Sequence, residues 1–105
     1  MKNKTICTTN CDITKTLKEL KELGYNYIIK ANDKALSYWG LATNKIHIQL
    51  IACKTVEEKD TILHDLYSDK WFNYINWYYI DDIKQIKAIA RDKSYTIRNY
   101  WTRAF

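Results

Sequence analysis

The chain has 105 residues, of which 47% are hydrophobic and 28% charged, values that are ordinary for a globular protein. A chain of this length builds one core, so we expect residues 1–105 to form a single domain. It contains no run of about 18 apolar residues, and no apolar segment follows its charged N-terminus. These features exclude a membrane-spanning helix and a secreted protein, and they predict a cytoplasmic chain with no membrane partner.

The first half of the chain predicts one helix followed by strands. Residues 1–11 are polar and form either an edge strand or a loose segment. A helix is predicted at residues 12–23, because Asp12 can cap it, apolar residues recur at helical spacing and Gly24 can end it. Segments rich in β-branched and aromatic residues then predict an antiparallel meander of three strands, with a turn at residues 32–34. The strands are residues 25–31, 35–42 and 46–53.

A second helix and a strongly aromatic strand come next. The helix is predicted at residues 55–67, where Thr55 and Glu58 fit a capping box. Residues 71–80 predict a strand without a polar face. Such a strand is either central in its sheet, or its second face is an interface, for example that of a homodimer.

The last quarter of the chain predicts a helix and a final strand. Asp81-Asp82 can cap a helix over residues 82–91. Residues 94–105 fit either a strand or a helix, and their β-branched and aromatic content favours the strand. The complete order predicts an α+β fold, with an antiparallel or mixed sheet of four or five strands and three helices packed on it.

Groups suited to catalysis or metal binding are sparse. Cys7, Cys11 and Cys53 are an odd number of cysteines in a chain without a secretion signal, which predicts reduced thiols. A zinc site built from Cys7, Cys11 and one histidine lacks an evident fourth ligand. A nucleophile pair of Cys53 with His47 or His64 is opposed by the apolar surroundings of Cys53. We therefore expect no metal, no cofactor and no enzymatic activity.

Basic and aromatic residues gather near the C-terminus of a chain whose net charge is +5. Cations contact phosphates and rings stack on bases, so this pattern predicts a surface for nucleic acid, or equally for an acidic groove on a protein. The alternative is a solvated helix face followed by a core strand, and a helix-turn-helix over residues 82–103 is a further option. The predicted binding surface comprises Lys84, Lys87, Arg91, Lys93, Arg98, Tyr100, Trp101 and Arg103.

The segment DKALSYWGLA at residues 33–42 resembles a D-K-x-L-S-x-W-G-x-A pattern in small, uncharacterised proteins of phages and other mobile elements. The similarity extends over about residues 25–80, and Tyr38 departs from it where glycine is expected. The resemblance brings no residue roles with it. It implies a small accessory protein that acts inside a host cell.

Charge and resemblance together predict a non-enzymatic binding protein. We expect it to inhibit a host nucleic-acid-handling or defence machine, in the manner of anti-CRISPR proteins, through the basic aromatic surface. Its partner would then be nucleic acid, a host nucleoprotein or a nuclease. The alternative is a DNA- or RNA-binding protein with no protein target.

Overall fold

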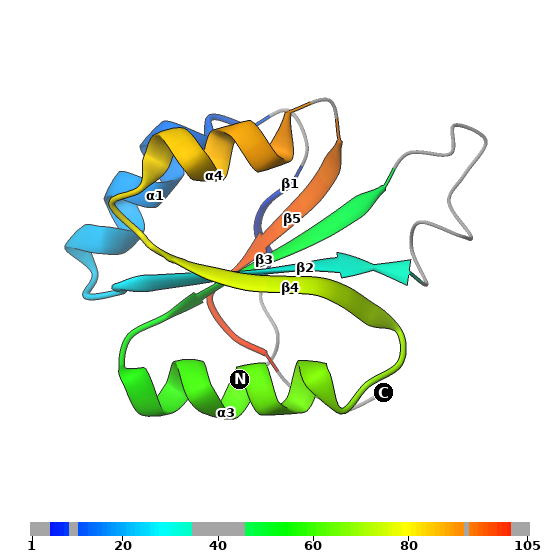
Figure 1. Ribbon diagram of the computed structural model, residues 1–105. Coiled ribbons are helices and arrows are strands. Elements are labelled where there is room, and N and C mark those ends of the chain that lie inside the picture. Colours follow the sequence, from blue (N-terminus) through cyan, green and yellow to red (C-terminus); the bar gives the residue numbers. More distant parts are fainter. Residues whose placement is uncertain (1–4, 9–10, 35–45, 92, 102–105) are drawn as a thin grey trace.

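The computed structural model describes residues 5–8, 11–34, 46–91 and 93–101. It confirms the predicted α+β fold (Figure 1), and its radius of gyration of 12.8 Å matches the value of about 13 Å for one domain of this length. Within the described residues no helix has the length and apolarity needed to cross a lipid bilayer. The elements are β1 (Thr5–Thr8), α1 (Ile13–Glu22), β2 (Tyr27–Asp33), β3 (His47–Cys53), α3 (Val56–Tyr67), β4 (Phe72–Tyr79), α4 (Ile83–Ala90) and β5 (Ser94–Arg98).

The strands form one mixed sheet in the order β1-β5-β3-β2-β4. β3 and β5 run parallel, and the other three pairs are antiparallel. Helices α1 and α4 cover one face of the sheet and α3 covers the other (Figure 1). β1 and β4 are the two edges, so the edge strand expected within residues 1–11 is confirmed.

Two core clusters lie on the two faces of the sheet, because successive residues of a strand point to opposite faces. Ile28 and Leu50 face α1 and α4, whereas Ile29 and Ile51 face α3. On the α1/α4 side the helices contribute Ile13, Leu17, Leu20, Ile86 and Ala90. On the other side α3 contributes Ile62 and Leu66.

The first two predicted helix starts are confirmed. Asp12 accepts a hydrogen bond from the Lys15 N–H at 3.1 Å, and Thr55 accepts one from the Glu58 N–H at 3.1 Å. The Glu58 carboxylate reaches back to the Lys54 N–H at 2.6 Å. Gly24 has a φ of +102°, which an L side chain rarely adopts.

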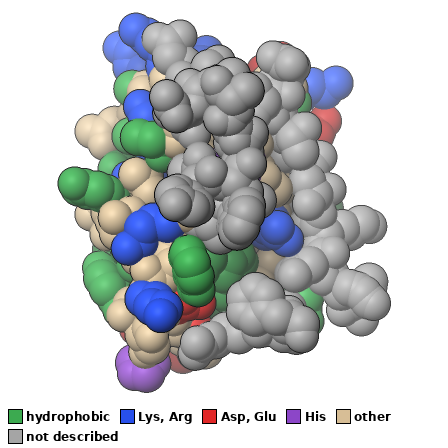
Figure 2. All heavy atoms as spheres, turned by 90° about the vertical axis from the view of Figure 1, so that its right-hand side faces the viewer, with side chains coloured by type: hydrophobic (Ala, Val, Ile, Leu, Met, Phe, Trp, Pro, Cys, Tyr) green, Lys and Arg blue, Asp and Glu red, His purple; other side chains and the backbone are tan. Residues whose placement is uncertain are grey.

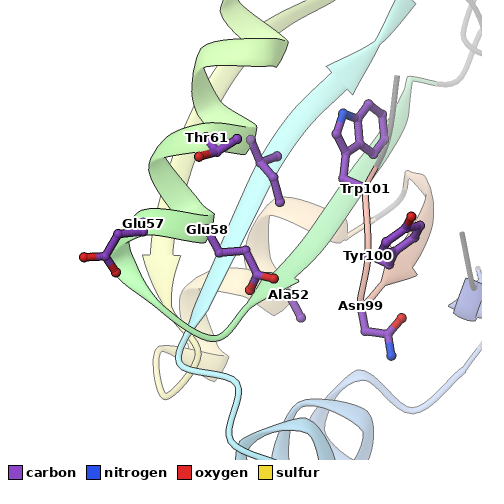
Figure 3. Close-up of a pocket in the computed structure, with 8 residues that line it drawn as sticks. Ala52, Glu57, Glu58, Thr61, Asn99, Tyr100 and Trp101 are labelled. Atoms are coloured by element: carbon purple, nitrogen blue, oxygen red, sulfur yellow. The ribbon is translucent and has the colours of Figure 1, made fainter. Parts of the chain in front are cut away.

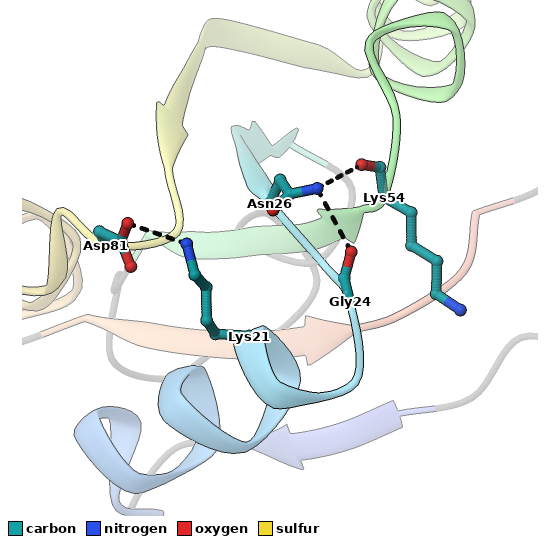
Figure 4. Close-up of polar contacts among 5 residues, drawn as sticks. All are labelled: Lys21, Gly24, Asn26, Lys54 and Asp81. Carbon is teal, nitrogen blue, oxygen red and sulfur yellow. Dashed lines mark hydrogen bonds and ion pairs between the residues drawn. The ribbon is translucent and has the colours of Figure 1, made fainter.

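Two polar links join turns at one end of the sheet (Figure 4). The Asn26 side-chain amide donates to the carbonyls of Lys54, at 2.8 Å, and Gly24, at 3.4 Å. Lys21 of α1 pairs with Asp81 at 3.0 Å. The expected capping of the third helix is therefore wrong in detail: Asp81 binds Lys21, and the Asp82 side chain makes no capping hydrogen bond.

The structure corrects four predictions. The turn at residues 32–34 is wrong, because Asn32 pairs with β3 and Asp33 pairs with β4, which prolongs β2. The meander is wrong in its pairing, because β2 lies directly between β3 and β4, which leaves no place for residues 35–42 between β2 and β3; those residues themselves lie outside the described ones. β4 is an edge strand and not a central one. The helix-turn-helix is wrong because residues 94–98 form β5.

A bulge in β4 changes which of its side chains share a face. Lys30 pairs with Asn76 and Asn32 with Asn73, so β4 has one residue more than β2 over this stretch. Phe72 consequently packs on the α3 side together with Ile75, although simple alternation puts them on opposite sides.

Candidate functional site

The residues of the predicted binding surface do not form one surface. Lys84, Lys87 and Arg91 are exposed on α4, which covers the α1/α4 face of the sheet. Arg98 and Trp101 lie on the α3 side, where Trp101 packs against that core cluster. Tyr100 is exposed beside α3. Lys93 follows α4 and lines a pocket on the α1/α4 face, and Arg103 lies outside the described residues.

Arg98 is engaged inside the fold. Its Nε donates to Gln49 at 2.9 Å, and the Gln49 side-chain amide donates to Asp33 at 2.9 Å. Its guanidinium lies 5.8 Å from the centre of the Trp101 ring. Burial lowers the pKa of Arg98, and the Asp33 carboxylate opposes that shift. Arg98 therefore stabilises the junction of β2, β3 and β5.

Tyr100 and Trp101 line a pocket of about 310 Å³ between α3 and the segment that follows β5 (Figure 3). Its wall also carries Glu57 and Glu58, and we call it the two-glutamate pocket. Trp101 meets Phe72 edge-to-face with ring centres 5.4 Å apart. The Glu58 carboxylate points from α3 toward the pocket (Figure 3), and its negative charge makes the pocket unfavourable for a phosphate.

Exposed aromatic rings concentrate around the edge strand β4 instead. Five large aromatic side chains of β4 and its neighbours reach solvent, and we call them the β4 surface. They are Tyr67 (68% exposed), Trp71 (48%), Tyr74 (72%), Trp77 (38%) and Tyr79 (56%). Buried rings stabilise a core, but rings left this exposed on an unpaired sheet edge are typical of a binding surface.

Lysine ammonium groups lie over three rings of the β4 surface. The distances from Nζ to ring centre are 5.7 Å for Lys30 and Tyr74, 4.1 Å for Lys59 and Trp77, and 6.0 Å for Lys70 and Trp71. Cations within about 6 Å of a ring face are attracted by its quadrupole. Lysine charge therefore lies next to aromatic rings on both faces of this edge, and the Lys59 ammonium is the buried one of the three.

On the α3 side the rings pack against one another. Trp77 contacts both Tyr27 and Tyr79 edge-to-face, with ring centres 5.7 Å and 5.2 Å apart. Lys59 is only 7% exposed and pairs with Asp60 at 3.0 Å. This cluster holds the outer ring, Tyr79, in place while leaving it accessible.

On the α1/α4 side the bulge presents Tyr74. Its φ is +51°, a left-handed conformation that costs a residue with a Cβ about 1–2 kcal/mol. The Lys30 ammonium donates to the Tyr74 carbonyl at 2.9 Å and so fixes the bulge. Strain of this kind on an exposed ring is a feature of functional sites.

A second pocket, of about 340 Å³, opens beside Tyr74, and we call it the two-lysine pocket. Lys30 and Lys93 both line it, and no carboxylate does so among the described residues. Burial lowers the pKa of Lys30, and the charge of Lys93 lowers it further. Its remaining walls are Asn32, Ile46, Ile48 and Ile89. Figure 2 faces this end of the molecule, where Lys and Arg side chains lie beside hydrophobic ones.

Sequence reasoning included Lys93 but missed Lys30, Asn32 and Tyr74. The sequence predicts Lys30 in a strand and Asn32 in a turn, and neither position indicates a binding residue. Tyr74 is one of four tyrosine and tryptophan residues in β4. Only the bulge and the pairing of β2 with β4 bring these three side chains together with Lys93.

The thiols and imidazoles do not form a nucleophilic site in the described structure. Cys53 is fully buried, and burial raises its pKa to about 12, so its thiolate is scarce at neutral pH. His47 lies 2.8 Å from both the Ser94 and the Thr96 hydroxyl. No cluster of three described His, Cys, Asp or Glu residues is placed to hold a metal ion.

The prediction of reduced thiols holds for Cys53 and is wrong for Cys11. Cys53 is a free thiol within the α3-side core. Cys11 is disulfide-bonded, and its partner is not among the described side chains.

Comparison with known proteins found no relative of this chain. No protein-family model matches the chain, and no curated protein or solved structure is significantly similar to it.

Proposed function

We propose that this protein binds single-stranded nucleic acid through the β4 surface. The observation that carries the proposal is the row of exposed rings along one sheet edge, with the ammonium groups of Lys30 and Lys70 over two of them. Proteins that bind single strands combine cations that track the phosphates with aromatic rings on which bases stack. Each stacked base contributes about 1–3 kcal/mol to such binding.

The arrangement favours a single strand over a duplex. Rings stack on a base only where its face is accessible, and in a duplex both faces are covered by neighbouring bases. The described part of this edge is an extended strand, β4, and not a helix of the kind that enters a major groove. The net charge of +5 adds long-range attraction to any polyanion.

Inhibition of a host nucleic-acid-handling or defence machine stays a prediction of the sequence. Such a machine could be inhibited by a protein that binds its displaced strand or its guide strand. The β4 surface supports the strand-binding step and does not by itself indicate the machine.

The test is fluorescence anisotropy with labelled DNA and RNA single strands of about 12 nucleotides, and with the matching duplex, at about 50 and about 200 mM salt. Tyr79→Ala should weaken single-strand binding about tenfold, because it removes one stacking ring. Tyr100→Ala is the matched control, since Tyr100 is also exposed (41%) but lies beside Glu57 and Glu58.

Two results would overturn the proposal. One is that the folded protein binds neither DNA nor RNA single strands at the lower salt. The other is that Tyr100→Ala weakens binding as much as Tyr79→Ala does. Sedimentation of the free protein should accompany the titration, because a dimer paired through β4 would cover Tyr79 and support a homodimer interface instead.

A further inference from the structure

We propose that the two-lysine pocket binds one nucleotide of the strand, with its phosphate between Lys30 and Lys93 and its base on the ring of Tyr74. This inference rests on the proposed function and names the part of the strand that the pocket holds. The pocket volume of about 340 Å³ lies at the lower end of the range for small-ligand sites.

The charge of the walls indicates an anion. Two lysines line the pocket, and none of its described lining residues is acidic. Their ammonium groups repel one another, which is one reason why the pKa of Lys30 is lowered, after burial. A phosphate between the two ammonium groups would accept a charge-assisted hydrogen bond from each, and its negative charge would offset their repulsion. A neutral ligand would leave the repulsion unrelieved.

The position of Tyr74 indicates that the anion is part of a nucleotide. Lys30 donates to the Tyr74 carbonyl at 2.9 Å and lies 5.7 Å from the ring centre. The cation and the ring are thus held at a set separation. The ring is 72% exposed, so it can receive a base while Lys30 contacts the adjoining phosphate.

The other walls complete a nucleotide site. The side-chain oxygen of Asn32 is buried and has no hydrogen-bond partner among the described residues. A buried acceptor of this kind is stabilised by a donor, and every nucleobase or its sugar carries one. Ile46, Ile48 and Ile89 offer apolar contact for the sugar.

An acidic peptide would satisfy the lysines equally well, but nothing in that ligand would use Tyr74 and Asn32 together. The nucleotide therefore explains more of the pocket. The peptide is an outcome that the experiment below distinguishes.

The test follows the backbone amides of the full chain by NMR during titration with AMP, adenosine, inorganic phosphate or a tetra-aspartate peptide. AMP should shift the amides of Tyr74, Ile89 and Lys93 at lower concentration than adenosine or phosphate alone. Lys93→Gln should weaken AMP binding about tenfold, because it removes one charge-assisted contact. Lys93 is varied in preference to Lys30 because Lys30 also holds the Tyr74 carbonyl.

Salt dependence of strand binding gives a second readout. Lys93→Gln should reduce the slope of log affinity against log salt by about 0.7, the value for one phosphate contact with a single strand. Lys87→Gln is the matched control, because Lys87 is an exposed lysine on α4 outside this pocket. The inference is overturned if both variants change the slope equally, or if the peptide shifts the same amides more strongly than AMP.

The two proposals fail separately. Single-strand binding that weakens in Tyr79→Ala but has an unchanged salt slope in Lys93→Gln would overturn the nucleotide pocket and leave the function standing. AMP shifts at Tyr74 and Lys93 in a protein that binds no single strand would overturn the function and support a mononucleotide site.

Discussion

The two-lysine pocket and the two-glutamate pocket are nearly equal in volume, at about 340 and 310 Å³, and each has an aromatic wall. They lie on opposite faces of the sheet and differ in charge. One carries Lys30 and Lys93, and the other carries Glu57 and Glu58. Size and aromatic content are therefore poor guides to a ligand in this molecule, and the charge of the walls decides which pocket suits an anion.

The aromatic residues of the two pockets, Trp101 and Tyr74, also differ in how far they are packed into the fold. Trp101 is packed between Phe72 and the Arg98 guanidinium, so its ring is part of the fold. Tyr74 is largely exposed and sits on strained backbone, so its ring adds little to stability. Substitutions in one pocket should consequently affect stability, and substitutions in the other should affect binding.

The largest change in stability is expected for Trp101→Ala. Removing a packed indole should lower the free energy of unfolding by about 2–3 kcal/mol, which urea denaturation followed by circular dichroism would measure. The comparison variant is Tyr100→Ala, which should change it by less than about 1 kcal/mol because Tyr100 is 41% exposed. Equal effects of the two variants would show that Trp101 is not a structural ring.

A smaller effect, of opposite sign, is expected for Tyr74→Asn. Asparagine tolerates a φ of +51° better than tyrosine does, so the variant should unfold with a free energy higher by about 1 kcal/mol. The same variant should bind single strands about tenfold more weakly, since the stacking ring is lost. A variant that loses both stability and affinity would show that the Tyr74 ring supports the bulge.

The smallest effect is expected in the pH dependence of stability, through His47. Burial is the main cause that lowers the pKa of His47 below its usual value of 6.5. The Asp33 carboxylate raises this pKa, and the Arg98 guanidinium lowers it. The imidazole of His47 therefore takes up a proton more readily in the unfolded chain than in the folded one. The free energy of unfolding consequently falls as pH decreases through 6.5. His47→Gln should lose less stability than the native chain between about pH 7.5 and about pH 5.5.

Urea denaturation at each pH would measure that difference. An identical decline in the native chain and in His47→Gln would show that the imidazole is protonated as easily in the fold as outside it. The hydroxyls of Ser94 and Thr96 would then be accepting from a charged ring.

Much of the secondary structure was predictable because it depends on neighbours in the chain. The helices at residues 12–23 and 55–67 follow from Asp12, Thr55 and regularly spaced apolar residues. The strand expected at residues 46–53 appears as β3, with every residue from Ile48 to Cys53 buried. The spacing of residues could not predict that β4 lies at an edge, because an apolar strand has the same sequence pattern at the edge and in the centre of a sheet.

The candidate site was predictable only in its residue types. The expectation that basic and aromatic residues act together is met near β4, but Lys93 is the one predicted residue that lies in the two-lysine pocket among the described residues. Arg98 and Trp101 were expected at the surface and instead contact Gln49 and Phe72. β5 ends at Arg98, so the alternation that puts Trp101 on the face of Tyr95 does not continue.

The α+β composition, the starts of the first two helices and the positive charge follow from the sequence alone, because caps, periodicity and charge depend on residues close together in the chain. Which rings stay exposed, and which cations lie beside them, depends on contacts between distant segments. Lys30, Tyr74 and Lys93 come from three distant segments, and they meet only through the pairing of β2 with β4, the bulge at Tyr74 and the packing of α4. Those long-range contacts partly bury Trp101 against Phe72 and leave Tyr74 72% exposed, although both are aromatic residues that lie close to a cation in the fold.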